Sequence, residues 1–157
     1  MSAPAIGRDA IAGLIPHAGR MCLLDTVVAW SDGEIECRSD SHRDPAHPLR
    51  HGGALAAVHL AEYGAQAMAI HGGLLGRAAG APVRRGLLVT LRDLKLAVAR
   101  IDDIAAPLVV RARRLLANPD GQLYAFEIAA DGQALASGRA GVIHPGPVSP
   151  EAVSSRA

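Results

Sequence analysis

The sequence predicts an α+β fold in which an antiparallel β-sheet wraps round one long α-helix. Residues 54–75 form a mainly apolar stretch, rich in alanine and glycine, that is long enough for this helix. Alternating β-type segments lie before and after it, and Asp-Gly pairs separate the later ones at Asp120–Gly121 and Asp131–Gly132. Such pairs between alternating segments are a strong hairpin signal. We expect a single domain over residues 1–144 and a disordered, Pro/Ser-rich tail over residues 145–157.

The first half of the chain supplies two strands ahead of the long helix. Asp9 is expected to cap a short helix over residues 10–14. The apolar segment 21–30 has β-type composition, and a Ser-Asp-Gly turn connects it to the alternating segment 34–39. Residues 40–53 contain two prolines and three histidines, so we expect an irregular connection there.

The second half of the chain is predicted to form the rest of the sheet. Residues 76–82, rich in glycine, alanine and proline, are expected to be a surface loop. Strands are predicted over 86–98, 107–117, 123–130 and 134–143. The predicted order is therefore a short helix, two strands, one long helix and about four strands.

The long helix carries an acidic residue in otherwise apolar surroundings. In helical spacing its small and apolar side chains share one face: Val58, Ala61, Ala65, Met68, Ala69 and Gly72. Glu62 lies on the edge of this face, where a carboxylate is costly to bury unless it is paired, protonated or open to a cavity. Histidine and glycine gather just upstream, at His47, His51, Gly52 and Gly53. This combination predicts a reactive site where the helix begins.

Composition narrows the class of protein. A formal net charge of +1 argues against a general nucleic-acid binder. Two cysteines without CxxC spacing disfavour a disulfide scaffold or a structural zinc site, and no metal site is expected. Phosphate-binding glycine motifs are missing from the sequence, so no cofactor is expected. The sequence shows no signal-peptide pattern and no apolar stretch of ~18 residues, which predicts a cytoplasmic protein without a membrane partner.

Two motifs resemble those of β-hydroxyacyl-acyl carrier protein dehydratases. Residues 15–27 (IPHAGRMCLLDTV) are similar to the L-P-H-x-x-P-F-L-L-x-D-x-V opening of that family. Residues 62–66 (EYGAQ) match its E-x-x-A-Q helix motif. The resemblance runs from Ile11 to Ile143 and implies the hotdog fold. Residues 53–69 and 86–93 are closer to a divergent branch, whose members are encoded with aryl polyene or xanthomonadin-type pigment synthases.

The resemblance implies a reaction and a site. Family members eliminate water from a (3R)-hydroxyacyl thioester to give a trans-2-enoyl thioester, in fatty acid or polyene biosynthesis. They use a histidine and a glutamate that meet across a dimer interface. The substrate would be an acyl carrier protein or CoA thioester, and the partner an identical chain or another hotdog protein. Glu62 matches the family glutamate directly, whereas Pro48 occupies the position of the family histidine.

The sequence therefore leads to a specific hypothesis about the site. Glu62 acts as acid or base, and His51 or His47 of the other subunit is its partner. Backbone amides near Gly52 and Gly53 hold the thioester carbonyl. Separately, Gln66 either orients Glu62 or satisfies a neighbouring carbonyl, and His17 is expected to be structural, tying the N-terminal segment to the sheet.

Two alternative functions remain open. The first is a non-catalytic hotdog subunit that supports an active dehydratase partner, because the family histidine has no counterpart at its own position. The second is an acyl thioesterase, since hotdog thioesterases also use a helix carboxylate, and fold alone cannot separate these reactions. Arg77, Arg84 and Arg85 could dock an acidic carrier protein or could simply be solvated.

Overall fold

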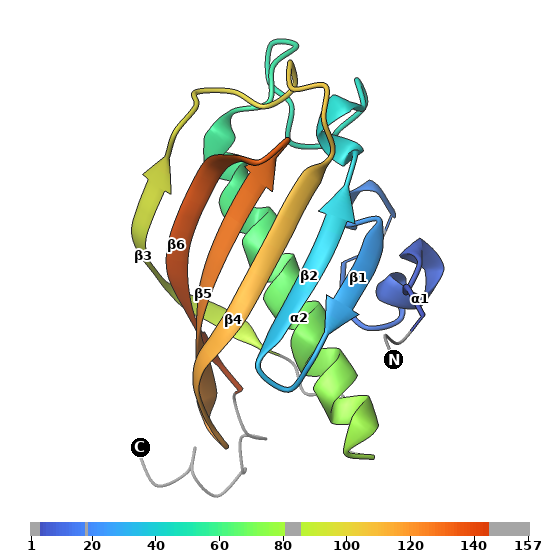
Figure 1. Ribbon diagram of the computed structural model, residues 1–157, viewed down its shortest axis with the longest axis vertical. Helices are drawn as coiled ribbons and strands as arrows, with labels where there is room; N and C mark the ends of the chain where they lie inside the picture. Colours follow the sequence, from blue (N-terminus) through green and yellow to red (C-terminus); the bar gives the residue numbers. More distant parts are fainter. Residues whose placement is uncertain (1–3, 18, 81–85, 145–157) are drawn as a thin grey trace, which may run out of the picture.

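In the computed structural model, which describes residues 4–17, 19–80 and 86–144, an antiparallel sheet curls round one long helix (Figure 1). The sheet has six strands in the order β1-β2-β4-β5-β6-β3, and every neighbouring pair is antiparallel. The strands are β1 (Thr26–Trp30), β2 (Glu34–Ser39), β3 (Leu87–Leu96), β4 (Leu108–Asn118), β5 (Gly121–Ala130) and β6 (Gln133–Ile143). The predicted fold class and element order are confirmed, and the predicted tail at 145–157 lies outside the described residues.

The long helix α2 spans Leu60–Ala78, and the 3-10 turn η3 (Ala57–His59) precedes it. The helix begins later than predicted because the preceding backbone pairs elsewhere. The Ala57 amide donates to the Ala99 carbonyl at 2.9 Å, and the Ile101 amide donates to the Leu55 carbonyl at 3.0 Å. The helix also continues to Ala78, into the segment predicted as a loop.

Two boundaries near the N-terminus also differ from the prediction. The short helix α1 (Arg8–Ala12) begins at Arg8, and its N-cap is Gly7, so the predicted Asp9 cap is wrong. The first strand begins at Thr26 rather than Met21. Side chains take the place of strand-to-strand hydrogen bonds in the segment before Thr26: the Leu23 amide donates to Gln66, and the Leu23 carbonyl accepts from Ser39. The other short elements are the 3-10 turns η1 (Gly19–Met21) and η2 (Ser41–Arg43).

Glycine allows α2 to approach the sheet closely. The ring of Phe126 on β5 lies close to both Gly64 of α2 and Gly138 of β6. A Cβ atom at either glycine would lie 2.8 Å from a ring carbon of Phe126, which is closer than van der Waals contact permits. The core is otherwise built mainly from Leu, Ile, Val and Ala, with Tyr63 and Tyr124 fully buried.

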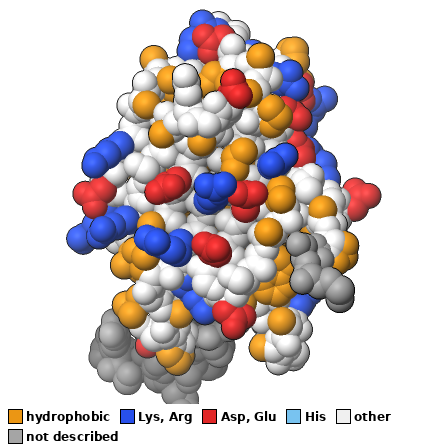
Figure 2. Space-filling model, in the orientation of Figure 1, with side chains coloured by type: hydrophobic (Ala, Val, Ile, Leu, Met, Phe, Trp, Pro, Cys, Tyr) orange, Lys and Arg blue, Asp and Glu red, His pale blue; other side chains and the backbone are white. Residues whose placement is uncertain are grey.

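The two faces and the edges of the sheet differ in character. Acidic and basic side chains mix on the outer face (Figure 2), where Arg111 pairs in register with Glu36 and Glu127. The edge strand β3 instead exposes large apolar side chains, namely Leu87, Leu88, Leu91 and Leu96. An exposed apolar edge strand offers unpaired backbone groups to another chain. Within the described residues, no helix is both long and apolar enough to cross a membrane.

Candidate active site

A cavity of about 820 Å³ runs beside α2. The helix contributes small residues to its wall, spaced so that they share one face: Ala65, Ala69, Gly72, Gly73 and Gly76. Residues 13–17 and parts of β3 to β6 supply the other walls. Glu62 and His17 both line this cavity. Of the helix face predicted from the sequence, Ala65, Met68, Ala69 and Gly72 border this cavity, whereas Val58 and Ala61 do not. The cavity wall also carries a carboxylate and an imidazole.

Glu62 is half-buried, and one of its oxygens lies close to two side-chain nitrogens. His17 Nε2 lies 3.1 Å from Glu62 Oε1, and Gln66 Nε2 donates to the same atom at 3.3 Å. The Glu62 side chain keeps 33% of its surface exposed. Within the described part of the chain, both contacts fall on Oε1, so Oε2 stays available to a molecule in the cavity.

Gln66 is fully buried, and its amide orientation is set by backbone groups. Its Oε1 accepts the Leu23 amide at 2.9 Å, and its Nε2 donates to the Met21 carbonyl at 2.6 Å. An amide nitrogen has two N–H groups, so one remains for Glu62. Gln66 therefore does both things considered from the sequence: it satisfies a carbonyl and it contacts Glu62.

His17 contacts α2 rather than the sheet, which corrects the expectation from the sequence. Its side chain is 28% exposed, and Nε2 faces Glu62. Its Nδ1 is buried and has no hydrogen-bond partner among the described residues. This contact could not be predicted from the sequence because His17 and Glu62 lie far apart along the chain. The I-P-H motif was the one sequence feature that singled out His17.

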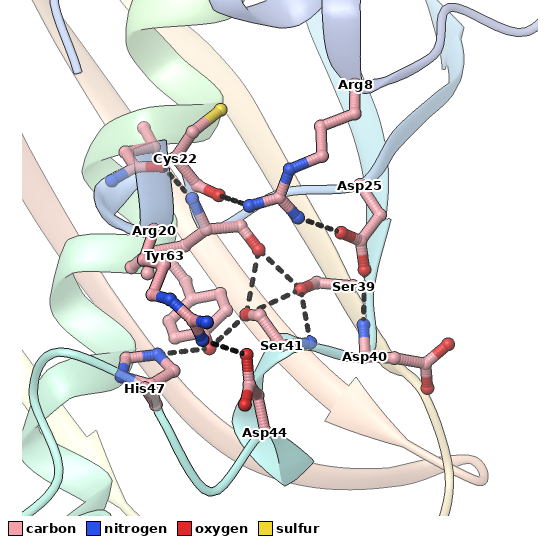
Figure 3. Close-up of polar contacts among 12 residues, drawn as sticks. Arg8, Arg20, Cys22, Asp25, Ser39, Asp40, Ser41, Asp44, His47 and Tyr63 are labelled. Atoms are coloured by element: carbon pink, nitrogen blue, oxygen red, sulfur yellow. Dashed lines mark hydrogen bonds and ion pairs between the residues drawn. The ribbon is translucent and has the colours of Figure 1, made fainter. Parts of the chain in front are cut away.

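His47 lies in a separate, buried hydrogen-bonded network (Figure 3). Its Nδ1 accepts the Leu49 amide at 3.1 Å, so Nε2 carries the proton and donates to the Tyr63 hydroxyl at 3.1 Å. Burial lowers the pKa of His47 below the usual histidine value, with the nearby Arg50 charge as a further cause. Within one chain, His47 does not line the Glu62 cavity.

The same network connects the irregular segment 40–53 to α2 and to Leu23, whose backbone amide is bonded to the Gln66 side chain. The Tyr63 hydroxyl lies 2.6 Å from Ser41 Oγ, and the Ser41 and Ser39 hydroxyls both donate to the Leu23 carbonyl (Figure 3). Burial raises the pKa of Tyr63 to about 12, so this hydroxyl stays neutral near pH 7. Leu23 thus connects the network, through its carbonyl and its amide, to the Gln66 side chain.

His51, Gly52 and Gly53 form an exposed tight turn away from the cavity. The His51 amide donates to the Ala54 carbonyl at 2.8 Å, and the Ala54 amide returns a bond to the His51 carbonyl at 3.1 Å. Gly52 and Gly53 have φ angles of 58° and 78°, which glycine adopts without strain. Of the predicted site residues, Glu62 and Gln66 are in contact within one chain. The remaining predicted residues, His47, His51, Gly52 and Gly53, do not line the Glu62 cavity of that chain.

Metal-ligand clusters of three or more His, Cys, Asp or Glu do not occur in the described ranges. Cys22 and Cys37 are free and buried, and burial raises the pKa of Cys37 to about 12. Among the described residues, the ionisable side chains of the cavity are Glu62, His17, Arg114, Tyr124 and His144. The Glu62–His17 pair is therefore the candidate centre for acid/base chemistry.

A curled antiparallel sheet round one long helix, with a helix carboxylate open to a cavity, defines a hotdog-fold protein. The chain belongs to the ApeP-like family, because the family model described as ApeP dehydratase matches residues 9–153. The resemblance noted from the two motifs is thereby confirmed. Among curated protein sequences, no significant match to the chain is found.

Solved structures share the fold. The dehydratase heterocomplex ApeI:P from Xenorhabdus doucetiae superposes with a TM-score of 0.79 at 24% identity, covering 87% of this chain and 91% of that chain. Zebra fish thioesterase superfamily member 2 gives a TM-score of 0.57 at 16% identity, with coverages of 89% and 99%. A thioesterase family protein from Silicibacter pomeroyi gives 0.54 at 15% identity, with coverages of 74% and 81%. At these identities the likeness establishes the fold alone.

Proposed function

We propose that this chain takes part in the dehydration of a (3R)-hydroxyacyl thioester, carried by an acyl carrier protein or CoA, with Glu62 as an acid/base group. The observation that carries the proposal is a half-buried carboxylate at the wall of a cavity of about 820 Å³, with a nitrogen of His17 and a nitrogen of Gln66 next to one of its oxygens. Membership of the ApeP-like dehydratase family supports this reaction class. The cavity's small-residue wall leaves room for an acyl chain.

Dehydration needs two proton transfers and stabilisation of developing negative charge. One group removes the C2 proton, and a second protonates the hydroxyl that leaves from C3. N–H donors stabilise the charge that builds on the thioester oxygen. Glu62 supplies one of the two proton-transferring groups, and a second must approach the open Oε2 side of the cavity.

The second group is proposed to come from another hotdog subunit. His51 is exposed and can reach across an interface, whereas His47 is buried and uses both ring nitrogens within its own chain. The amides of Gly52 and Gly53 lie in the same exposed turn and are the proposed donors for the thioester oxygen. The exposed leucines of β3 provide the edge along which a second subunit, identical or not, would pair.

A supporting, non-catalytic role is the second candidate, and one observation favours it. Pro48 stands where the resembled dehydratases have their histidine, and its neighbour His47 is engaged with Tyr63. A chain of this kind would complete the cavity of an active partner. The dehydration would then depend on acid/base residues of that partner.

The test is turnover of a 3-hydroxyacyl-carrier-protein thioester, followed by mass spectrometry. We expect loss of water with wild type, alone or with a hotdog partner, and at least a ~100-fold lower rate with Glu62→Gln. Glu34→Gln, an exposed change on β2, is the matched control and should leave the rate unchanged. Full activity of Glu62→Gln beside an active partner would assign the supporting role. Release of free acid would indicate a thioesterase.

A further inference from the structure

We propose that His17 is a positioning residue for Glu62, an inference that rests on the proposed acid/base role of that carboxylate. His17 Nε2 lies 3.1 Å from Glu62 Oε1 and approaches it from outside α2, while Gln66 donates to the same oxygen from within α2. Two donors on one oxygen fix the rotation of the carboxylate. The second oxygen, Oε2, is then directed to the molecule that occupies the cavity.

The direction of the His17 hydrogen bond follows from its surroundings. Nδ1 is buried and lacks a partner within the described residues, and a buried N–H without an acceptor is costly. Nε2 lies 3.1 Å from a carboxylate oxygen, whose lone pairs would repel an unprotonated ring nitrogen. Both observations place the ring hydrogen on Nε2, where it is donated to Glu62.

The backbone that carries His17 is anchored against α2. Leu14 and Ile15 are buried, and Gly73 faces Leu14 so closely that a Cβ atom there would lie 3.2 Å from Leu14 Cδ2. The chain therefore runs along the helix from Gly73 towards Glu62 and delivers His17 to the carboxylate. A ring held in this way restrains Glu62, because its own backbone is fixed by packing.

Kinetics of two substitutions at His17 test the proposal. His17→Leu removes the donor, and we expect kcat to fall about 10- to 100-fold with KM nearly unchanged, because the carboxylate loses its orientation. His17→Gln keeps an N–H donor at a similar reach, and we expect it to recover most of that loss. His59→Leu changes a histidine that does not line the cavity and serves as the matched control. Wild-type kcat in His17→Leu would overturn the proposal, as would a failure of rescue in a folded His17→Gln.

A spectroscopic readout separates this inference from the proposed function. In 15N-histidine-labelled protein, the His17 ring should carry its hydrogen on Nε2, and its signal should change in Glu62→Ala. His17→Gln assigns the signal, and thermal unfolding shows whether each variant is folded. Should the wild-type chain turn over no thioester, either alone or with a hotdog partner, the proposed function fails while this measurement still applies. A His17 signal that ignores Glu62→Ala overturns the positioning role by itself.

Discussion

Gln66 is the residue that connects the N-terminal segment to Glu62. Its buried amide accepts from the Leu23 backbone, donates to the Met21 carbonyl and donates to Glu62 Oε1. The first two bonds leave the amide a single orientation, so its remaining N–H points at the carboxylate. The orientation of Glu62 therefore depends on residues 21–23, whose backbone groups bond to the Gln66 side chain instead of to a neighbouring strand.

We expect Gln66→Leu to destabilise the fold as well as disorder Glu62. The substitution leaves the Leu23 amide and the Met21 carbonyl without their partner, at a cost of about 1–3 kcal/mol. Urea unfolding measures this loss, with Gln133→Leu at an exposed position of β6 as the control. An unfolding free energy equal to that of wild type would show that water replaces the amide without cost.

Glu62 and Gln66 could be predicted from the sequence because both lie on one helix, four residues apart, where neighbours are set by helix geometry. The role of His17 could not, because its contact with Glu62 depends on how residues 13–17 fold back along α2, which is a tertiary feature. His47 is near the family's histidine position in sequence, yet its ring points to Tyr63. Proximity along an irregular segment does not determine side-chain direction.

At the scale of elements, the packing of α2 on the sheet depends on the space around Phe126. Gly64 and Gly138 both lie against the ring, and neither position has room for a Cβ atom. The sequence indicated this close approach through the small residues of the helix. It did not indicate where the helix begins, because residues 55–57 bond to residues 99–101, which lie on a distant loop.

Two alanine substitutions in α2 should change stability in opposite directions. Gly64→Ala forces a methyl group to within 2.8 Å of the Phe126 ring, and we expect a loss of about 1–3 kcal/mol from overpacking. A Cβ atom at Gly72 would meet nothing within 4 Å. Because alanine loses less backbone entropy than glycine on folding, Gly72→Ala should stabilise the protein by about 0.5–1 kcal/mol. Chemical denaturation of both variants measures the difference. Equal effects would show that α2 shifts to accommodate the methyl group.

At the scale of the whole molecule, three buried histidines connect separate parts of the fold. His71 of α2 donates from Nε2 to the Ser31 carbonyl and accepts from the Tyr124 hydroxyl at Nδ1, each at 2.7 Å. His42 Nε2 donates to the Ile104 carbonyl at 2.9 Å, and His47 joins Leu49 to Tyr63. His71 and His47 use one ring nitrogen as an acceptor, so each must be neutral to keep both bonds.

The fold should therefore lose stability in mild acid. Burial lowers the pKa of His42, His47 and His71, while the same residues in the unfolded chain bind protons near pH 6.5. As pH falls below about 6.5, the unfolded chain takes up protons that the folded chain does not, and the free energy of unfolding decreases. The slope can reach ~1.4 kcal/mol per pH unit for each histidine.

Urea unfolding between pH 7.5 and pH 5.5 measures this dependence, in a window above the range in which most carboxylates titrate. His71→Asn should reduce the slope of the free energy of unfolding against pH by the contribution of one histidine, because it removes one group that binds a proton in the unfolded chain. His51→Ala removes an exposed histidine and should leave the slope close to that of wild type. A free energy of unfolding that stays constant over this range would mean that the buried rings accept protons as readily as free histidine does.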